Sequence, residues 1–390
     1  MIRLMKNSFY NEASTKAALV EFIMGAERFS MSNQCKTFEE NFAAWQGRKH
    51  ALFVMNGSMA NLVLIQALLN MGRLSPGDKI GFSAVTWSTN VMPLIQLGLV
   101  PVPIDCEIET LNISSTHLKQ AIATESIKAL FITNALGFAD DLDTISALCA
   151  EHNIMLLEDN CESLGTELNG KKLGNFGVAS TFSTFIGHHM STIEGGLICT
   201  DDDELFAHIT MCRAHGWDRN LTADRQQSLR TAAGVDDFFA AYTFHELAYN
   251  ARPTEIQGFL GNVQLQYLDE MISKRQKNYE RFTAAIPLDR VYPIRSQHLN
   301  VVSNFAMPII CRDKETFTQY LTKFKAAEIE IRPVIAGNMT HQPFYRKHIS
   351  TEYDLPHADY IHDYGFYFGN HPDLTEAEVS FLAETLSSPS

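Results

Sequence analysis

Residues 183–196 read STFIGHHMSTIEGG, a stretch that combines the end of a strand, a pair of histidines and a glycine turn. The run 179–185 predicts a strand that brings the hydroxyl groups of Ser183 and Thr184 toward its carboxyl end. His188 and His189 follow in a loop, and Gly195-Gly196 leads into a second short strand at 196–200. Because an imidazole gains and loses its proton near neutral pH, His188 is a candidate acid–base catalyst.

Short apolar runs alternate with helical segments on the N-terminal side of this stretch. Runs of β type lie at 51–55, 79–83, 100–104, 128–133 and 154–158. The alternation predicts an α/β fold with a mixed, mostly parallel sheet, in which 179–185 and 196–200 are adjacent strands. Ligands of open parallel sheets bind beyond the carboxyl ends of the strands, so we expect the site at that edge.

The length of 390 residues favours two domains. We expect a large domain over residues 1–270 and a smaller C-terminal α+β domain over residues 271–390. A single long helix from about Thr254 through Arg275 should join them. In the smaller domain the pattern predicts a strand at 304–310, a helix at 314–327 and a last helix that begins with the capping-box pair Thr375 and Glu378. At the other end of the chain, apolar residues within 13–25 predict an amphipathic helix.

Composition excludes several classes of partner. The chain has 31 basic and 45 acidic residues and a formal net charge of −14, so we expect neither nucleic acid nor an anionic membrane as a partner. Its seven cysteines are scattered, without a CxxC pattern, which indicates free thiols in a reducing cytoplasm and no zinc or iron–sulfur ligand set. The N-terminus lacks the apolar core of a signal peptide, and the apolar stretch 91–104 is too short to cross a bilayer.

Two further segments carry groups suited to a phosphorylated, ring-containing ligand. Asn56-Gly57-Ser58 lies between a strand and a helix, where backbone amides attract phosphate, although the same residues also suit an ordinary turn. Glu158-Asp159 ends an apolar strand, and a carboxylate there can pair with a pyridinium nitrogen, or it can simply cap the following turn. Each segment alone is a weak signal.

Together with the 183–196 stretch, these segments resemble the DegT/StrS-type nucleotide-sugar aminotransferase family, which has the aspartate aminotransferase fold. The family pattern is a serine, a lysine five residues later and Glu-Gly-Gly six residues after the lysine; here Ser183 and Glu194-Gly195-Gly196 match, and His188 occupies the position of the lysine. The resemblance covers nearly the whole chain. Further matches are Phe38, Glu39, Phe42, Thr86-Trp87, Asp105, Thr110, Asn112, Glu162, Gly165, His215-Gly216, Arg219, Asn250-Ala251-Arg252 and Gln264-Leu265.

The resemblance implies a PLP-dependent transferase of fold type I, with pyridoxal or pyridoxamine phosphate as cofactor and a homodimer that shares its active sites. The cofactor-binding residues it implies are Gly57, Ser58, Trp87, Asp159, Glu162, Ser183, Asn250 and Arg252, with Asn250 reaching a phosphate in the neighbouring subunit. The substrate-binding residues it implies are His215, Arg219, Arg28, Met31, Glu330 and Arg332. His215, Arg219, Arg252 and Arg332 are all candidates to hold an amino-acid carboxylate or a diphosphate.

The absent lysine can be examined without the family. No lysine occurs between Lys172 and Lys274, so no amine from residues 173–273 can bond covalently to the cofactor aldehyde. Histidine can serve as the base but cannot form a stable imine. We therefore expect a noncovalently bound cofactor that rests in the pyridoxamine form, with His188 as the catalytic acid and base.

This substitution resembles the lysine-lacking branch of the family, the nucleotide-sugar 3-dehydratases of colitose-type deoxysugar biosynthesis. Members that act on CDP-sugars use an iron–sulfur cluster, for which this chain lacks closely spaced cysteines. The resemblance thus implies removal of the C3 hydroxyl from GDP-4-keto-6-deoxy-D-mannose, with L-glutamate regenerating the amine form of the cofactor.

Three other readings stay open at this point. The chain could be a nucleotide-sugar aminotransferase of the same fold, which would give an amino sugar. A metal-dependent hydrolase would use His188, His189 and His215, but the spacing matches no zinc motif. A non-catalytic nucleotide-sugar-binding protein would not need a base beside Asp159 and Ser183.

Overall fold

The computed structural model describes residues 1–388. Its main element is a seven-stranded sheet in the order β1-β9-β8-β5-β4-β2-β3. These strands are β1 His50–Val54, β2 Lys79–Ser83, β3 Val100–Ile104, β4 Ile127–Thr133, β5 Met155–Asp159, β8 Ala179–Ser183 and β9 Gly196–Thr200. The strands from β8 to β3 are parallel, whereas β9 is antiparallel to both β8 and β1. The predicted mixed, mostly parallel sheet is therefore confirmed, and so is the adjacency of 179–185 and 196–200.

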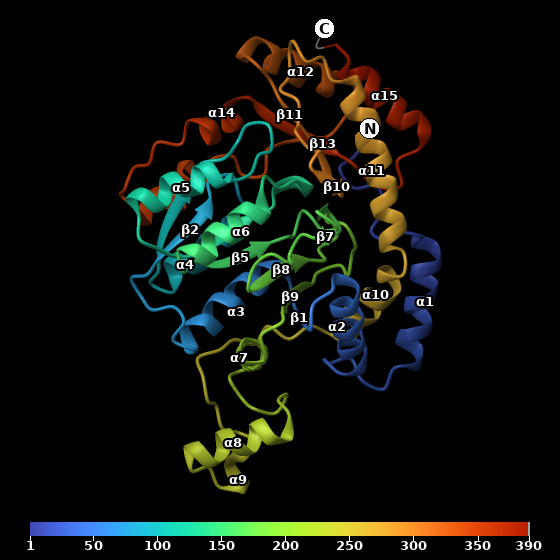
Figure 1. Cartoon of the computed structure of the whole chain (residues 1–390). Coiled ribbons are helices and arrows are strands. Elements are labelled where there is room, and N and C mark those ends of the chain that lie inside the picture. Colours follow the sequence, from blue (N-terminus) through green and yellow to red (C-terminus); the bar gives the residue numbers. More distant parts are fainter. Residues whose placement is uncertain (389–390) are drawn as a thin grey trace.

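Helices cover the sheet because each connection between its parallel strands must return along one of its faces. Those within the sheet region are α3 Gly57–Asn70, η1 Ser88–Asn90, α4 Met92–Gln96, α5 Ser115–Thr124, η2 Ala135–Gly137, α6 Leu142–Glu151 and α7 Asp203–Arg213. Strands β4, β5 and β8 bury almost every residue, as expected for strands with helices on both faces. In Figure 1, α5 and α6 lie over one part of the sheet and α3 over another.

The N-terminal helices lie at the β1 end of the sheet, and the second of them packs directly against it. They are α1 Glu12–Gly25 and α2 Asn33–Gln46, followed much later in the sequence by α10 Glu255–Leu265 and α11 Leu268–Ala285 (Figure 1). Helix α2 buries Phe38 and Phe42 against β1 and β8. Helix α1 instead leaves Val20 61% and Met24 82% exposed, so its predicted apolar face is largely uncovered in the single chain.

The prediction of one helix from Thr254 through Arg275 is wrong, because the chain breaks between α10 and α11. The Tyr267 N–H bonds to the Gln264 carbonyl, one residue short of the α-helical pattern, and this tight turn ends α10. Neither proline nor glycine marks the break in the sequence. Thr254 and Gln257 form a capping box at the start of α10, and Thr375 and Glu378 form the predicted one at the start of the last helix.

Two small three-stranded sheets lie outside the main sheet. One contains β6 Glu167–Leu168, β7 Lys171–Lys172 and β10 Leu299–Val301; the other contains β11 Ala306–Ile310, β12 Ile331–Pro333 and β13 Gly365–Gly369. The helices of the C-terminal region are α12 Lys314–Ala326, η3 Met339–His341, α13 Pro343–His348, α14 Pro356–Tyr364 and α15 Glu376–Leu386. The predicted strand at 304–310 and helix at 314–327 correspond to β11 and α12.

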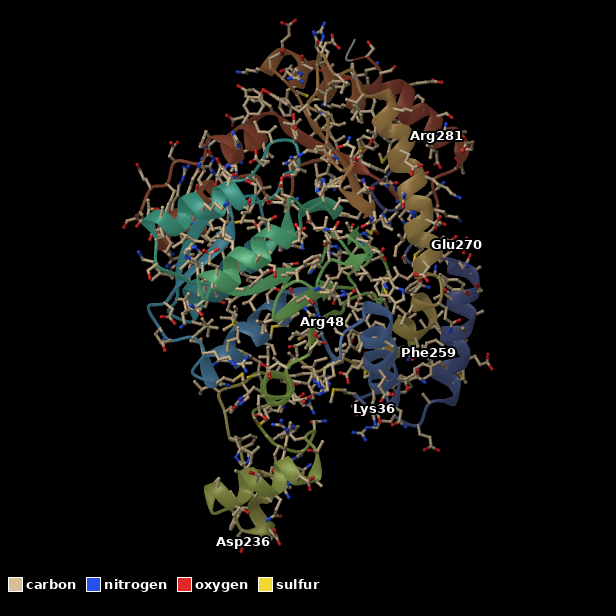
Figure 2. The ribbon with its side chains drawn as sticks, viewed as in Figure 1. Lys36, Arg48, Asp236, Phe259, Glu270 and Arg281 are labelled. Carbon is tan, nitrogen blue, oxygen red and sulfur yellow. The ribbon has the colours of Figure 1, made fainter. Side chains whose placement is uncertain are left out.

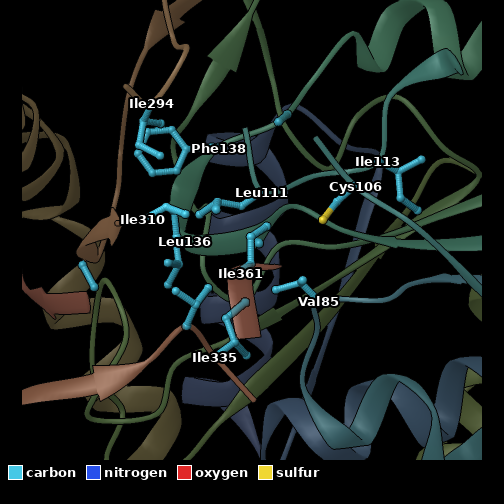
Figure 3. Close-up of a cluster of buried hydrophobic side chains, with 14 of the residues drawn as sticks. Val85, Cys106, Leu111, Ile113, Leu136, Phe138, Ile294, Ile310, Ile335 and Ile361 are labelled. Carbon is cyan, nitrogen blue, oxygen red and sulfur yellow. The ribbon is translucent and has the colours of Figure 1, made fainter. Parts of the chain in front are cut away.

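One apolar core joins the C-terminal elements to the main sheet. Figure 3 shows Cys106, Leu136 and Phe138 of the sheet region packed near Ile310 and Ile361. The N-terminal segment also reaches the C-terminal region, since Ile2 forms a β-bridge with Ile329. The domain division at 270/271 stays a prediction. Among residues 1–388 no helix combines the length and the hydropathy needed to cross a bilayer.

An arm projects from the body between α7 and α10. It carries α8 Ala223–Ala233 and α9 Asp237–Ala240, and Figure 2 places Asp236 at its far end. The arm exposes apolar side chains, among them Phe238 at 83% and Tyr242 at 75%. Such an exposed group on one projection is typical of a surface that another chain covers.

Candidate active site

A cavity of about 530 Å³ lies where β5 and β8 end and α3 begins. Its volume is within the range of sites for small organic ligands. It lies beyond the carboxyl ends of parallel strands, as expected from the sequence. The residues that line it are Leu4, Met5, Asn56, Gly57, Ser58, Asn61, Trp87, Thr89, Asn90, Thr133, Asp159, Cys161, Glu162, Ser183, Phe185, Gly187, His188, Glu194, Phe305, Ala306, Tyr367 and Gly369.

Seven of the residues selected from the sequence meet in this cavity: Gly57, Ser58, Trp87, Asp159, Glu162, Ser183 and His188. They come from four separate segments of the chain. Trp87 is 54% exposed, so its ring is not buried in the apolar core and can contact a ligand. No lysine occurs among the described residues that line the cavity.

Asp159 is held in one orientation by three N–H groups. Its Oδ2 accepts hydrogen bonds from Asn61 Nδ2 (2.9 Å) and Asn90 Nδ2 (2.7 Å), and its Oδ1 accepts one from the Cys161 backbone N–H (2.9 Å). The carboxylate is buried but borders the cavity. Asn61 and Asn90 were not selected from the sequence. Asn61 lies four residues after Gly57 on the same helix, and this helical spacing is the signal that could have identified it.

Glu158, the residue before Asp159, has a structural role. Its Oε1 accepts from the backbone N–H groups of Phe176 and Gly177, each at 2.7 Å, and its Oε2 accepts from that of Gly174. The carboxylate therefore fixes the loop that leads into β8. Adjacent residues in a strand point to opposite faces, which is why only Asp159 reaches the cavity.

The start of α3 forms a close backbone cradle. The Asn56 side chain accepts the Met59 N–H at 2.9 Å, and the Ala60 N–H bonds to the Asn56 carbonyl. The N–H groups of Gly57 and Ser58 are left at the helix start, where they can bind an anion. A Cβ at Gly57 would lie 2.8 Å from Ser183 Cβ, so no side chain is tolerated between α3 and β8.

His188 borders the cavity on a loop that is fixed from behind. Arg275 of α11 donates to the His188 carbonyl at 3.4 Å and also bonds to carbonyl groups of Phe305 and Asn370. His189 is buried, and its Nε2 donates to the Ser303 carbonyl at 2.7 Å, so it anchors the loop. The two histidines therefore do different work, one facing the cavity and the other the protein interior.

Burial of the His188 side chain away from water determines its protonation state. Protein atoms packed around the ring lower the pKa of His188 to about 4, although the Asp159 carboxylate opposes this shift. The imidazole is therefore neutral at pH 7 and able to accept a proton. Its Nδ1 is buried and makes no hydrogen bond within the described part of the chain.

Glu162 has the opposite shift. Burial raises the pKa of Glu162 from 4.5 to about 8, although its Oε2 accepts the Leu136 N–H at 2.8 Å. The Asp159 carboxylate adds to the rise by repulsion. At pH 7 the Glu162 side chain therefore carries a proton that it can donate into the cavity.

Four predicted residues form a second group away from the cavity, which we call the Trp217 cluster: His215, Arg219, Asn250 and Arg252 around Trp217. The His215 and Trp217 rings are 4.8 Å apart, and the guanidinium groups of Arg219 and Arg252 lie 4.0 and 5.4 Å from the Trp217 ring centre. Arg252 also donates to Asn250 Oδ1 at 2.9 Å. None of the four lines this chain's own cavity.

The remaining predicted residues also lie outside the cavity. Arg28 is exposed and donates to Ser30, and Met31 packs partly against the α2 core. Glu330 and Arg332 form an ion pair near the cavity rim, where Glu330 accepts the N–H of Leu4, a lining residue. Arg332 is paired across β12 and β13 with Tyr367, another lining residue.

Comparison with known proteins finds relatives that match this chain over nearly its whole length. A GDP-4-keto-6-deoxy-D-mannose 3-dehydratase of Escherichia coli O55:H7 is 36% identical over 389 residues, 98% of both chains. One from Yersinia pseudotuberculosis is 36% identical over 382 residues, 95% of both chains. A crystal structure of a GDP-4-keto-6-deoxymannose-3-dehydratase with a trapped PLP–glutamate geminal diamine matches with a TM-score of 0.89 at 33% identity, covering 99% of this chain and 100% of that one.

The family model described as the DegT/DnrJ/EryC1/StrS aminotransferase family matches residues 11–387. These matches confirm the fold predicted from the sequence, the aspartate aminotransferase-like fold type I. Because the matched region covers nearly the whole chain, this protein belongs to the DegT/DnrJ/EryC1/StrS aminotransferase family.

Proposed function

We propose that this chain is a pyridoxal/pyridoxamine phosphate-dependent enzyme that removes the C3 hydroxyl group of GDP-4-keto-6-deoxy-D-mannose. The observation that carries the proposal is the position of His188, which borders the cavity where the family pattern has a lysine. Relatives named for this reaction are 36% identical over nearly the full chain, which supports the choice of substrate.

The cavity residues fit the cofactor. Asp159, oriented by Asn61 and Asn90, would pair with the pyridine nitrogen, and Trp87 would stack on the ring. The amides of Gly57 and Ser58 with the Ser183 hydroxyl would hold the phosphate. The absence of space for a Cβ at Gly57 supports this assignment, because a backbone cradle must approach its ligand closely.

When bound, pyridoxamine phosphate supplies an amine that condenses with the sugar C4 ketone and a ring that accepts an electron pair. His188, neutral at pH 7, would accept a proton from the C4′ carbon of the cofactor. The imidazolium would then be positioned to donate this proton to the C3 hydroxyl, which would leave as water. Glu162, protonated at pH 7, would donate a hydrogen bond to the phenolic oxygen of the cofactor.

The complete reaction balances with glutamate as the second substrate. One oxygen atom leaves C3 of the sugar, which is reduced by two electrons. Glutamate is oxidised by two electrons to 2-oxoglutarate, and its nitrogen is released as ammonia. The products are a GDP-4-keto-3,6-dideoxy sugar, 2-oxoglutarate and ammonia. His215, Arg219, Arg252 and Arg332 are the cationic groups proposed to hold the glutamate carboxylate or the diphosphate, and Arg28, Met31 and Glu330 are proposed on the sugar side.

We propose that the enzyme is a homodimer in which the Trp217 cluster of one subunit completes the cavity of the other. Asn250 and Arg252 are exposed in the single chain and outside its own cavity, which supports this assignment. The uncovered apolar side chains of α1 and of the arm supply surface for the contact. A large domain over 1–270, a small domain over 271–390 and a cytoplasmic location also remain proposals, the last supported by seven unpaired cysteines.

Product analysis tests the reaction directly. The purified protein is loaded with pyridoxamine phosphate and incubated with GDP-4-keto-6-deoxymannose and glutamate. We expect ammonia, 2-oxoglutarate and a C3-deoxygenated sugar. An amino sugar as product would instead identify a nucleotide-sugar aminotransferase, and no turnover would favour a binding protein. Absorbance should indicate an exchangeable cofactor; a visible band that borohydride abolishes would contradict noncovalent binding.

A further inference from the structure

A further group of polar side chains lies outside the lining of the active-site cavity: Asp105, His117 and His357. One carboxylate oxygen of Asp105 and one ring nitrogen of each histidine all lie within 4.8 Å of one another. Among residues 1–388, this is the one group of three histidine, cysteine or acidic side chains whose ligand atoms converge in this way. The three residues are separated by 12 and 240 positions in the sequence, so only the fold brings them together.

The three residues come from different parts of the fold. Asp105 follows β3, His117 lies in the first turn of α5, and His357 is near the start of α14 (Figure 1). The two imidazole rings are 5.5 Å apart at an interplanar angle of 77°. Asp105 is buried, whereas both histidines are half-buried, so the group is accessible from the surface.

Both histidines are oriented by hydrogen bonds through Nδ1. His357 Nδ1 bonds to the Cys106 carbonyl at 2.7 Å, and His117 Nδ1 is 2.9 Å from Ser114 Oγ and 3.4 Å from Glu107 Oε1. In each ring Nε2 is therefore the nitrogen left to bind a metal. Histidine ligands in metalloproteins are oriented by this same pattern, in which the other ring nitrogen donates to a carbonyl or carboxylate.

Asp105 retains acceptor capacity. Its Oδ2 and Oδ1 accept the backbone N–H groups of His357 (3.1 Å) and Ala358 (2.8 Å) at the start of α14. Since each carboxylate oxygen has two lone pairs, both can accept a further bond. These contacts hold the Asp105 carboxylate against the His357 segment.

We infer that Asp105, His117 and His357 bind a divalent transition-metal ion, with zinc the best match to two imidazoles and one carboxylate. This ligand set favours zinc, copper or nickel over magnesium and calcium, which prefer all-oxygen sites. Tetrahedral zinc with bonds of about 2.0–2.2 Å needs ligand atoms about 3.3–3.5 Å apart. Because the present separations reach up to 4.8 Å, the imidazole side chains must move closer to Asp105 when the metal binds.

A neighbouring cavity gives access to the group from the side of His357. Its volume is about 350 Å³, and it is lined by Glu107, Ile108, Glu109, Tyr292, Arg295 and His357. Water can therefore reach the metal through this opening. Since the ligands join the β3–α5 region to α14, metal binding would tie the C-terminal segment to the main sheet. Helix α14 leads directly into β13, whose Tyr367 and Gly369 line the active-site cavity.

Zinc binding to tag-free, cofactor-loaded full-length protein tests the inference. Metal is first removed with a chelator, and zinc is then titrated in competition with a chromophoric chelator. We expect the parent protein to bind one zinc ion per chain. His117→Gln and His357→Gln should each bind zinc at least roughly a hundredfold more weakly than the parent. The Glu107→Gln variant, which alters the support of His117, should weaken binding roughly 10–100-fold. His152→Gln, at an exposed histidine remote from the group, is the matched control and should bind like the parent protein.

Two measurements separate metal binding from misfolding. Circular dichroism and melting without metal should be unchanged in His117→Gln, and zinc should raise the melting temperature of the parent and of His152→Gln but not of the two ligand variants. Cobalt in place of zinc should give the visible absorption of a four-coordinate site. Unchanged zinc stoichiometry in both ligand variants, or zinc lost only with His188→Asn, would overturn the inference.

Discussion

The neutral imidazole of His188 is the residue on which the proposed chemistry depends. Because burial lowers its pKa to about 4, the ring is ready to accept a proton at pH 7, and the charged form that results is a strong acid in the same position. Asn in its place has similar size and polarity but cannot carry out this transfer.

Replacement His188→Asn should therefore lower turnover by roughly 10²–10⁴-fold, the usual contribution of general acid–base catalysis. Cofactor binding should be little changed, since Asp159, Gly57 and Ser183 remain. The measurement is release of 2-oxoglutarate and of the deoxy sugar, together with cofactor affinity from absorbance or equilibrium dialysis. His189→Asn tests the other histidine and should mainly lower stability. Full turnover in His188→Asn would contradict the assigned role.

Glu162 makes a pH-dependent contribution to stability that can be measured without substrate. Its pKa is raised from 4.5 to about 8, so the folded chain binds one proton more than the unfolded chain between these values. The contribution of Glu162 to the free energy of unfolding is therefore fully present below pH 4.5 and is lost as the pH rises through about 8. Gln keeps the size and the acceptor for the Leu136 N–H but does not ionise.

The melting temperature of Glu162→Gln, relative to the parent protein without cofactor, should therefore increase steadily from pH 5 to pH 8.5. At pH 4.5 the two proteins should differ little. Thermal unfolding at five or six pH values is sufficient. A difference that stays constant across this range would show that the Glu162 carboxyl ionises normally.

At the scale of elements, the start of α3 controls the cavity through its contact with β8. A Cβ at Gly57 would lie 2.8 Å from Ser183 Cβ and 3.3 Å from Cys161 Sγ, so Gly57→Ala must push the helix away from the strand. We expect a loss of about 1–3 kcal/mol in the free energy of unfolding, as for other overpacked sites, and a clear loss of cofactor affinity.

The matched control is Gly25→Ala at the end of α1, where an added Cβ has no neighbour within 4 Å. It should leave cofactor affinity unchanged. Urea unfolding and a cofactor titration of the two variants give the comparison. Equal cofactor affinity in Gly57→Ala and Gly25→Ala would mean that the phosphate lies elsewhere.

Elements differ in how far they could be predicted. The apolar runs at 128–133 and 154–158 identified β4 and β5 because strands buried on both faces have continuous apolar sequences. The break between α10 and α11 has no such signal, since it depends on how Tyr267 and Leu268 pack rather than on proline or glycine. The arm with α8 and α9 was likewise not predicted, because its apolar residues remain exposed within one chain.

At the scale of the whole molecule, the proposed dimer places catalytic groups of one site on two chains. If the Trp217 cluster serves the partner's cavity, a mixture of His188→Asn and Arg252→Ala chains should recover activity. In a mixed dimer, one site would combine both defects, and the other would have an intact His188 and an intact Arg252.

Random pairing makes about half of the dimers mixed, each with one intact site, so activity should reach about a quarter of that of the parent protein. Each variant alone supplies the baseline, and light scattering confirms the oligomeric state. If the mixture is no more active than the average of the two variants, Arg252 acts within its own chain or has no part in the site.

Local patterns in the sequence were enough to predict the α/β fold and to select His188, and the resemblance carried by the 56–58, 158–159 and 183–196 segments implied the family and the roles of Asp159, Ser183 and Gly57. This is possible because strand periodicity, a lysine-free span and a glycine turn are properties of neighbouring residues. The packing of the chain was needed to find Asn61 and Asn90 around Asp159, Arg275 behind His188, and the convergence of Asp105, His117 and His357. It also separated the Trp217 cluster from the cavity. These relations depend on contacts between residues far apart in the sequence, whose distances no local pattern specifies.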